Sequence, residues 1–342
     1  MQIYLNSFGT YLHVRDAMFE IRVPGELGKQ SVHHLAAKKV SAIILTAAGA
    51  MSSDAIRLAL THNVDLILAD RSGQPLGRFW HAKLGSTTKI RKRQLEASLD
   101  KRGMQYTASW LTAKLEAQCN FLKNLRKHRK RHHKLLDERI ERIGDLGTAM
   151  LTCAEGVERV SEVAETLRGL EGTAGRLYFQ TLSALIPEPY RFAGRSFRPA
   201  ADPFNAFLNY GYGILYGRVE KALMVAGLDP YVGFMHRDDY NQKSMVFDFI
   251  EPYRPWVDWV VFRLFSRKRV GLGDWGELAG GITLLKPGKE VLIESLTKFL
   301  DEDKVRHGRR NRSRANAMLA DAHRFAQELL GTEVEDVKVT EL

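Results

Sequence analysis

The sequence predicts an α+β protein in which an N-terminal β-rich, β-sandwich-like domain precedes a larger all-α domain. Up to residue 85, short runs of Val, Ile and Leu alternate with Gly, Asp and Ser, a pattern typical of strands and turns. From residue 95 onward, apolar side chains recur at intervals of three and four among strong helix formers. We therefore expect domains at residues 1–85 and 95–342, joined by a polar and basic linker at residues 86–94.

The composition is that of a globular protein with excess positive charge. A hydrophobic fraction of 44% in 342 residues is sufficient for packed cores. The 51 Lys and Arg residues exceed the 40 Asp and Glu residues, and the net charge of +11 favours an anionic partner such as nucleic acid. Two cysteines, Cys119 and Cys153, are too few for a disulfide framework or a Cys zinc cluster. Without an N-terminal signal region or an apolar run of roughly 20 residues, we expect a cytoplasmic protein that does not enter a membrane.

Five short apolar runs are the predicted strands of the N-terminal domain, at residues 3–5, 11–14, 19–22, 40–46 and 64–69. One helix interrupts them at residues 54–60, with Ser52 or Ser53 as its N-cap. His33 and His34 are adjacent, so in a strand they point to opposite faces and are poor joint metal ligands. We therefore expect the chemistry to lie in the helical domain.

A dense basic segment at residues 123–134 is expected to continue the first long helix of that domain. Like charges on neighbouring turns repel, so a nearby anion would be stabilising, although a solvated surface is the alternative. We assign DNA contacts in this segment to Lys123, Arg126, Lys127, Arg129, Lys130, Arg131 and Lys134. The same role is assigned to Arg198, to Arg267, and to Arg309, Arg310 and Arg312 in a second basic cluster at residues 306–314. Tyr216 is expected either to stack on a base or to be a core or hydrogen-bonded tyrosine.

The stretch at residues 233–258 contains half of a candidate metal site. His236 precedes Asp248 by twelve positions, and Glu251 follows Asp248 by three, so both acids would share one helical face and meet one cation. One imidazole with hard carboxylate oxygens suits Mg²⁺ or Mn²⁺, whereas zinc usually takes several His or Cys ligands. In the alternative, Asp248 caps the following helix and Glu251 lies in its first turn.

Glu171 is a third candidate because it interrupts an apolar helical stripe that includes Leu167 and Ala174. A buried carboxylate requires a metal, a hydrogen-bond network or an ion pair, here with Arg168 or Arg176. Glycines recur in the same helix at positions 169, 172 and 175. They predict close approach by another backbone, either a neighbouring helix or a nucleic-acid strand.

Three blocks carry a family resemblance through their order along the chain: EGTAGRLYF at residues 171–179, DPFNAFLNYGY at 202–212 and GFMHRDDYNQKSMVFDFIEPYRPWVD at 233–258. The sequence resembles CRISPR-associated protein 1, the spacer-acquisition integrase, over essentially its whole length. The resemblance implies metal ligands at Glu171, His236 and Asp248 and a homodimer contact made by the N-terminal domain. Glu251 stands where the family often has Asp, and it is a further candidate catalytic residue, as a ligand or as a supporting group.

The resemblance also implies a reaction and partners. A prespacer 3′-hydroxyl would attack phosphodiesters of the CRISPR repeat with Mg²⁺ or Mn²⁺ as cofactor, and water as the nucleophile would make the same site an endonuclease. The implied partners are double-stranded and branched DNA and CRISPR-associated protein 2. The alternative is a non-catalytic DNA-binding scaffold in which Glu171, His236 and Asp248 form a structural polar cluster.

Overall fold

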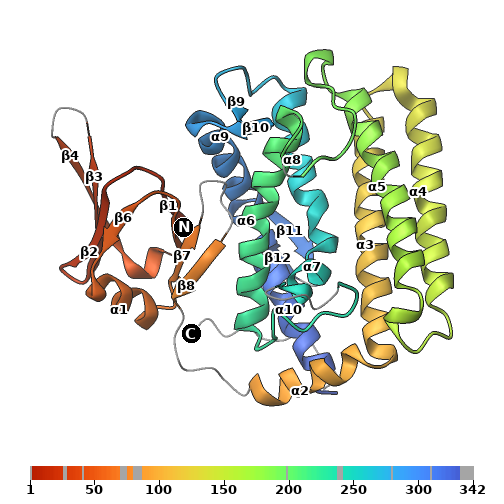
Figure 1. Cartoon of the computed structure of the whole chain (residues 1–342), viewed down its shortest axis with the longest axis horizontal. Helices are drawn as coiled ribbons and strands as arrows, with labels where there is room; N and C mark the ends of the chain where they lie inside the picture. Colours follow the sequence, from red (N-terminus) through yellow and green to blue (C-terminus); the bar gives the residue numbers. More distant parts are fainter. Residues whose placement is uncertain are drawn as a thin grey trace. The chain divides into compact units, whose positions relative to one another are not determined.

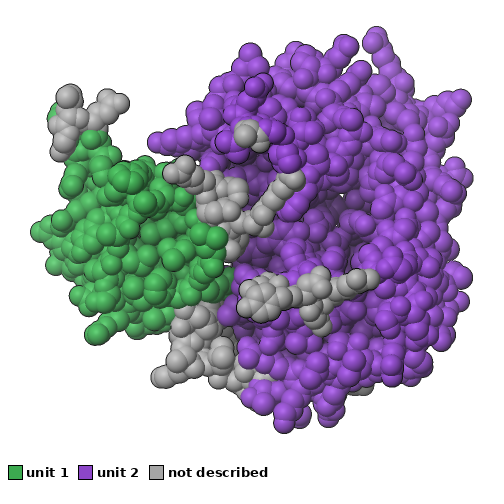
Figure 2. Space-filling model, in the orientation of Figure 1, with its two compact units in different colours: residues 1–85 green, residues 86–342 purple. Residues whose placement is uncertain are grey.

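The computed structural model describes residues 2–25, 29–40, 42–69, 75–79, 87–197, 199–236, 242–278, 280–308 and 310–331. The chain divides into two compact units, residues 1–85 and residues 86–342, which Figure 2 shows in separate colours. The first unit is rich in strands and the second is mainly helical (Figure 1). This order of strands and helices confirms the predicted α+β class.

The described strands of the first unit form two four-stranded sheets. One sheet has the order β1-β5-β7-β8, from β1 (Gln2–Leu5), β5 (Ala42–Leu45), β7 (Asp65–Ala69) and β8 (Pro75–Phe79). Its β8 is antiparallel to β7, and the other pairs are parallel. The second sheet has the order β4-β3-β2-β6, from β2 (Thr10–Arg15), β3 (Met18–Pro24), β4 (Gln30–Ala36) and β6 (Gly49–Met51).

A two-residue turn at Asp16 and Ala17 joins β2 to β3 and sets their register. Both residues have positive φ, 51° and 57°, as the hairpin turn that matches strand twist requires. The resulting register pairs Leu12 with Ile21, so both apolar side chains lie on one face of the second sheet.

One apolar core lies between the two sheets and α1 (Ser53–Thr61). Leu12 and Phe19 of the second sheet belong to the same buried cluster as Ile43 and Leu66 of the first sheet. Ser52 is the N-cap of α1, because its Oγ accepts a hydrogen bond from the main chain three residues later, at 3.2 Å. Two sheets that share a core agree with the predicted sandwich-like character.

The described part of the second unit contains nine α-helices: α2 (Thr87–Ser98), α3 (Lys101–Arg126), α4 (His133–Ala154), α5 (Ala164–Leu185), α6 (Pro203–Val225), α7 (Ser244–Phe249), α8 (Arg254–Ser266), α9 (Lys286–Thr297) and α10 (Arg314–Leu329). It also contains two short hairpins that the prediction of an all-α domain omitted: β9 (Trp275–Leu278) with β10 (Gly281–Leu284), and β11 (Lys304–His307) with β12 (Arg310–Ser313). Four-residue strands are too short for their alternation to stand out in a sequence. None of the described helices combines the length and apolar character needed to cross a membrane.

Helix α6 begins with a cap residue followed by a proline. Asp202 caps it by accepting a hydrogen bond from the Asn205 amide at 2.8 Å, and Pro203 occupies its first position. Phe204 and Phe207 are fully buried, and the helix contacts α7, α8, α9 and α10. Helix α6 therefore forms the centre of the packing in the C-terminal half of the unit.

The prediction that one helix continues through residues 123–134 is wrong. Helix α3 ends at Arg126 and α4 begins at His133, with a 3-10 turn (Lys130–His132) between them. Every side chain between Leu125 and Leu135 is polar or charged, so none of them holds a continuous helix against the core. The chain therefore reverses in the basic segment, and α3, α4 and α5 run side by side (Figure 1).

The predicted linker at residues 86–94 also differs from the structure, because α2 covers most of it. Ile90, Gln94 and Ala97 form a buried face of this helix. The Gln94 side-chain nitrogen donates to the Asp229 and Val232 carbonyls at 2.9 and 2.8 Å. Its polar composition concealed the helix, since Gln94 is buried through hydrogen bonds rather than apolar contact.

Candidate active site

The helical unit contains a cavity of about 680 Å³ with a strongly charged lining. Residues of α3, α5, α6 and α8 and of the loop at 234–236 line it. Its ionisable residues are Lys114, Arg168, Glu171, Arg176, Arg195, His236, Glu251, Arg254 and Asp258. Of the four predicted catalytic residues, Glu171, His236 and Glu251 line the cavity, whereas Asp248 lies behind it.

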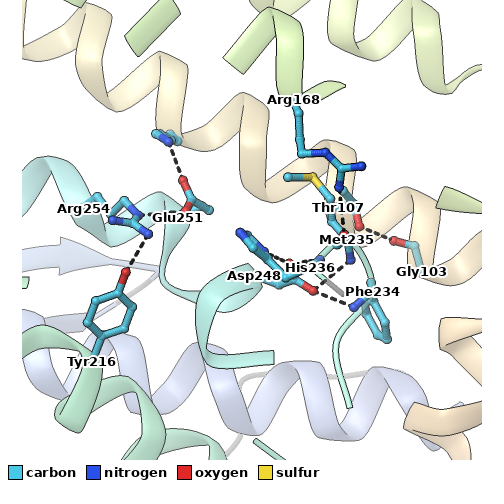
Figure 3. A network of polar contacts seen from close by, with 11 residues as sticks. Gly103, Thr107, Arg168, Tyr216, Phe234, Met235, His236, Asp248, Glu251 and Arg254 are labelled. Carbon is cyan, nitrogen blue, oxygen red and sulfur yellow. Dashed lines mark hydrogen bonds and ion pairs between the residues drawn. The ribbon is translucent and has the colours of Figure 1, made fainter. Parts of the chain in front are cut away.

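Asp248 lies in α7 and accepts four hydrogen bonds from the loop at residues 234–236 (Figure 3). Its Oδ2 accepts from the main-chain amides of Phe234 and Met235 at 2.6 and 3.0 Å. Its Oδ1 accepts from the amide and from Nδ1 of His236 at 3.2 and 2.6 Å. The Asp248 side chain is only 3% exposed, so both of its oxygens serve to hold the loop.

Gly233 permits this close approach of loop and helix. A Cβ at this position would lie 2.5 Å from the Ser244 Cβ and 3.1 Å from the Asp248 Oδ2. Any larger residue would push the loop away from α7 and stretch the hydrogen bonds to Asp248. Gly233 is therefore part of the construction that positions His236.

The contact with Asp248 decides which nitrogen of His236 can act. A carboxylate only accepts hydrogen bonds, so Nδ1 is the donor, and in the neutral imidazole Nε2 keeps its lone pair. The His236 side chain is 30% exposed and lines the cavity. His236 can therefore bind an ion or exchange a proton through Nε2, with Asp248 as its orienting partner.

Asp248 and Glu251 do not share one helical face as the spacing predicted. Helix α7 ends at Phe249, and Glu251 begins a 3-10 turn (Glu251–Tyr253) whose second residue, Pro252, has no amide hydrogen to continue an α-helix. The Glu251 carboxylate accepts from the Lys114 Nζ at 2.5 Å and from the Arg254 Nε at 2.8 Å. The two acids therefore point to different partners (Figure 3), and the helix-cap alternative for Asp248 is wrong as well, because it is the fifth residue of α7.

Glu171 has the partner that its position in an apolar stripe requires, but the partner is neither Arg168 nor Arg176. Lys114 of α3 donates through Nζ to the Glu171 Oε1. Arg168 instead pairs with Glu165 at 2.5 Å and donates to the Met235 carbonyl at 3.5 Å. Lys114 therefore bridges two carboxylates, those of Glu171 and Glu251.

Burial and neighbouring charges shift the pKa values of Glu251 and Lys114 in opposite directions. Burial raises the pKa of Glu251, but the charges of Arg254 and Lys114 outweigh it and lower the pKa from 4.5 to about 2. Burial lowers the pKa of Lys114, but the two carboxylates outweigh it and raise the pKa above its usual value. Glu251 and Lys114 therefore both stay ionised at neutral pH.

The residues present fit a hard divalent ion once Lys114 moves aside. As the side chains stand, no three His, Cys, Asp or Glu residues of the described chain lie close enough together to bind one metal ion. Lys114 occupies the position between the carboxylates of Glu171 and Glu251. With Lys114 moved aside, these carboxylates and the His236 Nε2 would offer oxygen-rich donors of the kind that Mg²⁺ and Mn²⁺ prefer. Asp248, the third predicted ligand, has both oxygens engaged by the loop at residues 234–236.

The glycines at positions 169, 172 and 175 face open space. A Cβ on any of them would meet no atom of the described chain within 4 Å, so the expected close packing of a neighbouring helix is absent there. Gly172 and Gly175 line the cavity. The backbone of α5 is thus uncovered at these positions, between the side chains that it presents to the cavity.

The basic segment at residues 123–134 forms the reversal between α3 and α4, and its members differ in their surroundings. Lys123, Lys127, Lys130, Arg131 and Lys134 are exposed. Arg126 pairs with Asp137 through two hydrogen bonds of 2.5 and 2.9 Å, and the Arg129 guanidinium lies 5.1 Å from the Phe262 ring centre. The exposed residues suit phosphate contacts, and Arg126 and Arg129 also stabilise the fold locally.

The remaining predicted DNA contacts are scattered. Arg267 and Arg310 are exposed, and Arg312 is half-buried in β12. Arg198 and Arg309 lie outside the described residues. Tyr216 is half-buried, and its hydroxyl accepts a hydrogen bond from Arg254 at 2.8 Å (Figure 3), which is the hydrogen-bonded alternative.

Lys114, Arg254 and Asp258 are site residues that the sequence prediction missed. Lys114 could have been found by the argument that identified Glu171, because it is a charged residue next to the apolar stripe formed by Leu111, Leu115 and Leu122. Asp258 likewise sits in the apolar helix α8 and is 1% exposed. Charged residues on predicted buried faces are therefore the signal to follow.

Comparison with known proteins assigns the chain to a family. The family model described as CRISPR associated protein Cas1 matches residues 3–298. A CRISPR-associated endonuclease Cas1 of Archaeoglobus fulgidus is 34% identical over 318 residues, which cover 90% of this chain and 91% of that protein. One from Pyrobaculum aerophilum is 33% identical over 254 residues, 74% of this chain and 77% of that protein.

Solved structures show the same fold. A casposase bound to integration product matches 98% of this chain and 92% of its own, with a TM-score of 0.80 and 22% identity. A CAS1 protein from Thermotoga maritima matches 98% of both chains, with a TM-score of 0.78 and 19% identity. The sequence matches and the shared fold together show that this chain belongs to the Cas1 family of CRISPR-associated proteins.

Proposed function

We propose that this chain is a divalent-metal-dependent DNA integrase and endonuclease that inserts new spacers into a CRISPR array. The observation that carries the proposal is that Glu171, His236 and Glu251 line one cavity together with several arginines. The names of the curated relatives, which are called CRISPR-associated endonucleases, support the nuclease activity. A shared fold with a casposase bound to integration product is consistent with strand transfer.

Glu171, Glu251 and the Nε2 of His236 would hold Mg²⁺ or Mn²⁺. The bound ion would polarise the scissile phosphate and stabilise negative charge on the leaving oxygen. Asp248 keeps the proton of His236 on Nδ1 and so keeps Nε2 available. Arg254 holds Glu251 through a 2.8 Å hydrogen bond, which fixes the orientation of that carboxylate.

The cavity also suits the backbone of a DNA strand. Arg168, Arg176 and Arg195 line it and can neutralise phosphates without reading sequence. The bare face at Gly172 and Gly175 allows the strand to approach α5 closely. We place the 3′-hydroxyl of a prespacer here, in line for attack on a phosphodiester of the repeat, and water at the same position would give hydrolysis.

The basic reversal between α3 and α4 would extend the DNA contact. Arg126 lies twelve residues beyond Lys114 in the same helix, so the reversal is about 18 Å from the cavity at 1.5 Å per residue. That distance corresponds to about five base pairs of duplex at about 3.4 Å each. The segment at residues 123–134 would therefore bind duplex flanking the reacting phosphate and supply affinity rather than chemistry.

The proposal includes partners and location. We propose that the chain acts in the cytoplasm as a homodimer formed through its first unit, with CRISPR-associated protein 2 and with double-stranded or branched DNA. A chain of a Cas6-RT-Cas1–Cas2 complex shares this fold over 97% of the present chain, with a TM-score of 0.76 and 20% identity. The present chain covers 35% of that larger protein.

One observation favours a second candidate, a non-catalytic DNA-binding scaffold. Lys114 already neutralises Glu171 and Glu251, as a structural polar cluster would require. Strand transfer of a labelled prespacer into repeat DNA separates the two candidates. Integration that requires Mg²⁺ or Mn²⁺ and stops with a chelator supports the enzyme, whereas DNA binding without product in any metal supports the scaffold.

A further inference from the structure

Lys114 is an unusual residue at the candidate metal site because it is buried and bridges two acids. Its side chain is 8% exposed, and its ammonium group contacts both Glu171 and Glu251, the latter at 2.5 Å. The Lys114 ammonium group lies between the two carboxylates. A metal ion bound by both carboxylates would need the same space. The ion must therefore replace the ammonium group, which would then need another acceptor in a buried place.

Such acceptors lie on the same cavity. The Gln118 Oε1 is buried and has no hydrogen-bond partner within the described part of the chain, and the Asp258 Oδ2 is buried near the Tyr178 hydroxyl. Gln118 is one helical turn beyond Lys114 on α3, and both Gln118 and Asp258 are 1% exposed. The other oxygen of Asp258 accepts a hydrogen bond from the Tyr212 hydroxyl. An ionised carboxylate buried in this way is costly to the fold unless a cation can reach it.

Lys114, Gln118 and Asp258 all line the same cavity. Residues four apart on a helix are neighbours, so the flexible four-carbon stem of Lys114 can turn toward the Gln118 side chain without moving α3. Burial has the largest effect on the Asp258 carboxyl and raises its pKa to about 6, whereas the Tyr212 hydrogen bond and the charges of Arg195 and Lys114 act in the opposite direction. Asp258 is thus a nearby anion that the present ion pairs of Lys114 do not use.

We propose that Lys114 is a two-position counterion, which bridges Glu171 and Glu251 in the metal-free protein and moves to Asp258 and Gln118 when a divalent ion binds. This inference rests on the proposed metal site. Such a counterion would account for the buried Asp258 in the cavity lining, and it would give Lys114 a role both before and after the ion binds. The lysine holds two like charges together before the ion arrives, and then leaves their oxygens to the ion.

The test is a double-mutant cycle on Mn²⁺ affinity, measured by calorimetry and by the EPR signal of free Mn²⁺ on the full chain without DNA. Lys114→Met removes the cation that the ion must displace, so Mn²⁺ should bind about tenfold more tightly, a difference of about 1.4 kcal/mol. Asp258→Asn removes the second position, so Mn²⁺ should bind about tenfold more weakly. In the double variant, Asp258→Asn should have no further effect, because no lysine remains to be received.

Two results would overturn the inference. If Asp258→Asn weakens Mn²⁺ binding equally with and without Lys114, Asp258 acts only through its long-range field. If Lys114→Met leaves the affinity unchanged, the lysine does not compete with the ion. Gln118→Met is the companion variant should Asp258→Asn fail to fold, and its effect should likewise vanish in the Lys114→Met background.

A second readout does not involve the ion. In chelator, Lys114→Met should lower the melting temperature, because two carboxylates then lose their common counterion, and Mn²⁺ should restore most of the loss. Glu251→Gln separates failure of the proposed metal site from failure of the counterion role of Lys114. If Mn²⁺ binds and Glu251→Gln abolishes binding but the cycle shows no coupling, only the counterion role of Lys114 fails. If Glu251→Gln leaves Mn²⁺ binding unchanged, the proposed metal site fails and the inference fails with it.

Discussion

Replacing Asp248 by Ala should destabilise the helical unit, because the carboxylate is the acceptor for a buried loop. The amides of Phe234 and Met235 donate to Oδ2, and both residues are 8% exposed. Leaving a buried donor without an acceptor costs about 1–3 kcal/mol. The free energy of unfolding should therefore fall by about 2–6 kcal/mol for the two amides. The His236 amide adds less, since that residue is partly exposed and water can reach it.

Urea unfolding followed by circular dichroism measures this difference, with Asp145→Ala as the matched control. Asp145 is an exposed acid on α4, and its loss should change the stability by less than about 0.5 kcal/mol. Asp248→Asn should be much milder than Asp248→Ala, because the amide oxygen can still accept from the two loop amides. If Asp248→Ala were as stable as the control, the hydrogen bonds to the loop would not be what holds His236 in place.

Three further predictions concern charge. The folded pKa of Glu251, about 2, lies below the ordinary value of 4.5. The stabilising effect of its ionised carboxylate is therefore present above pH 4.5 and is lost as the pH falls toward 2. Glu251→Gln should flatten acid unfolding over this range, and an unchanged acid limb would contradict the ion pairs. The pKa of Asp258 is shifted the other way, from 3.8 to about 6. Its favourable effect on folding is therefore present below pH 3.8 and is lost as the pH rises through 6. In urea unfolding at pH 8, Asp258→Asn should be more stable than wild type by up to about 3 kcal/mol, and equal stability would argue against burial of the charge. Replacing Lys130, Arg131 and Lys134 by Ala should weaken duplex binding, with strand transfer retained at saturating DNA. The slope of the logarithm of the binding constant against the logarithm of the salt concentration should fall by about 0.9 per lost phosphate contact. An unchanged slope would make the segment an ordinary solvated surface.

The fold class and the general location of the site could be predicted from the sequence. Strand-like runs before residue 85 and helical periodicity after residue 95 distinguish the two units, and caps such as Asp202 define helix starts through local chemistry. Glu171 was identified because a charge inside an apolar stripe requires a partner. These signals are local, so they survive without knowledge of the tertiary structure.

The partners and the roles within the site could not be predicted in the same way. Periodicity treats the segment from Asp248 to Glu251 as one continuous helix, but Pro252 and the following 3-10 turn rotate the two acids toward different neighbours. The Lys114 contacts join positions 57 and 137 residues apart, which no local pattern specifies. The prediction of a continuous helix at residues 123–134 was wrong for a related reason, since helix propensity cannot maintain a helix that has no apolar face to bury.

Mn²⁺ titration by EPR can distinguish the proposed ligands, Glu171, His236 and Glu251, from Asp248, which is proposed to orient His236. The comparison uses wild type, Glu251→Gln and Asp248→Asn, each checked for folding and for DNA affinity. Loss of an outer partner such as Asp248 should weaken Mn²⁺ binding by about 10–100-fold, and binding should remain measurable. Glu251→Gln should abolish Mn²⁺ binding and strand transfer while DNA affinity is retained. If Glu251→Gln kept the Mn²⁺ affinity of wild type and Asp248→Asn lost Mn²⁺ binding completely, then Asp248, and not Glu251, would be the ligand.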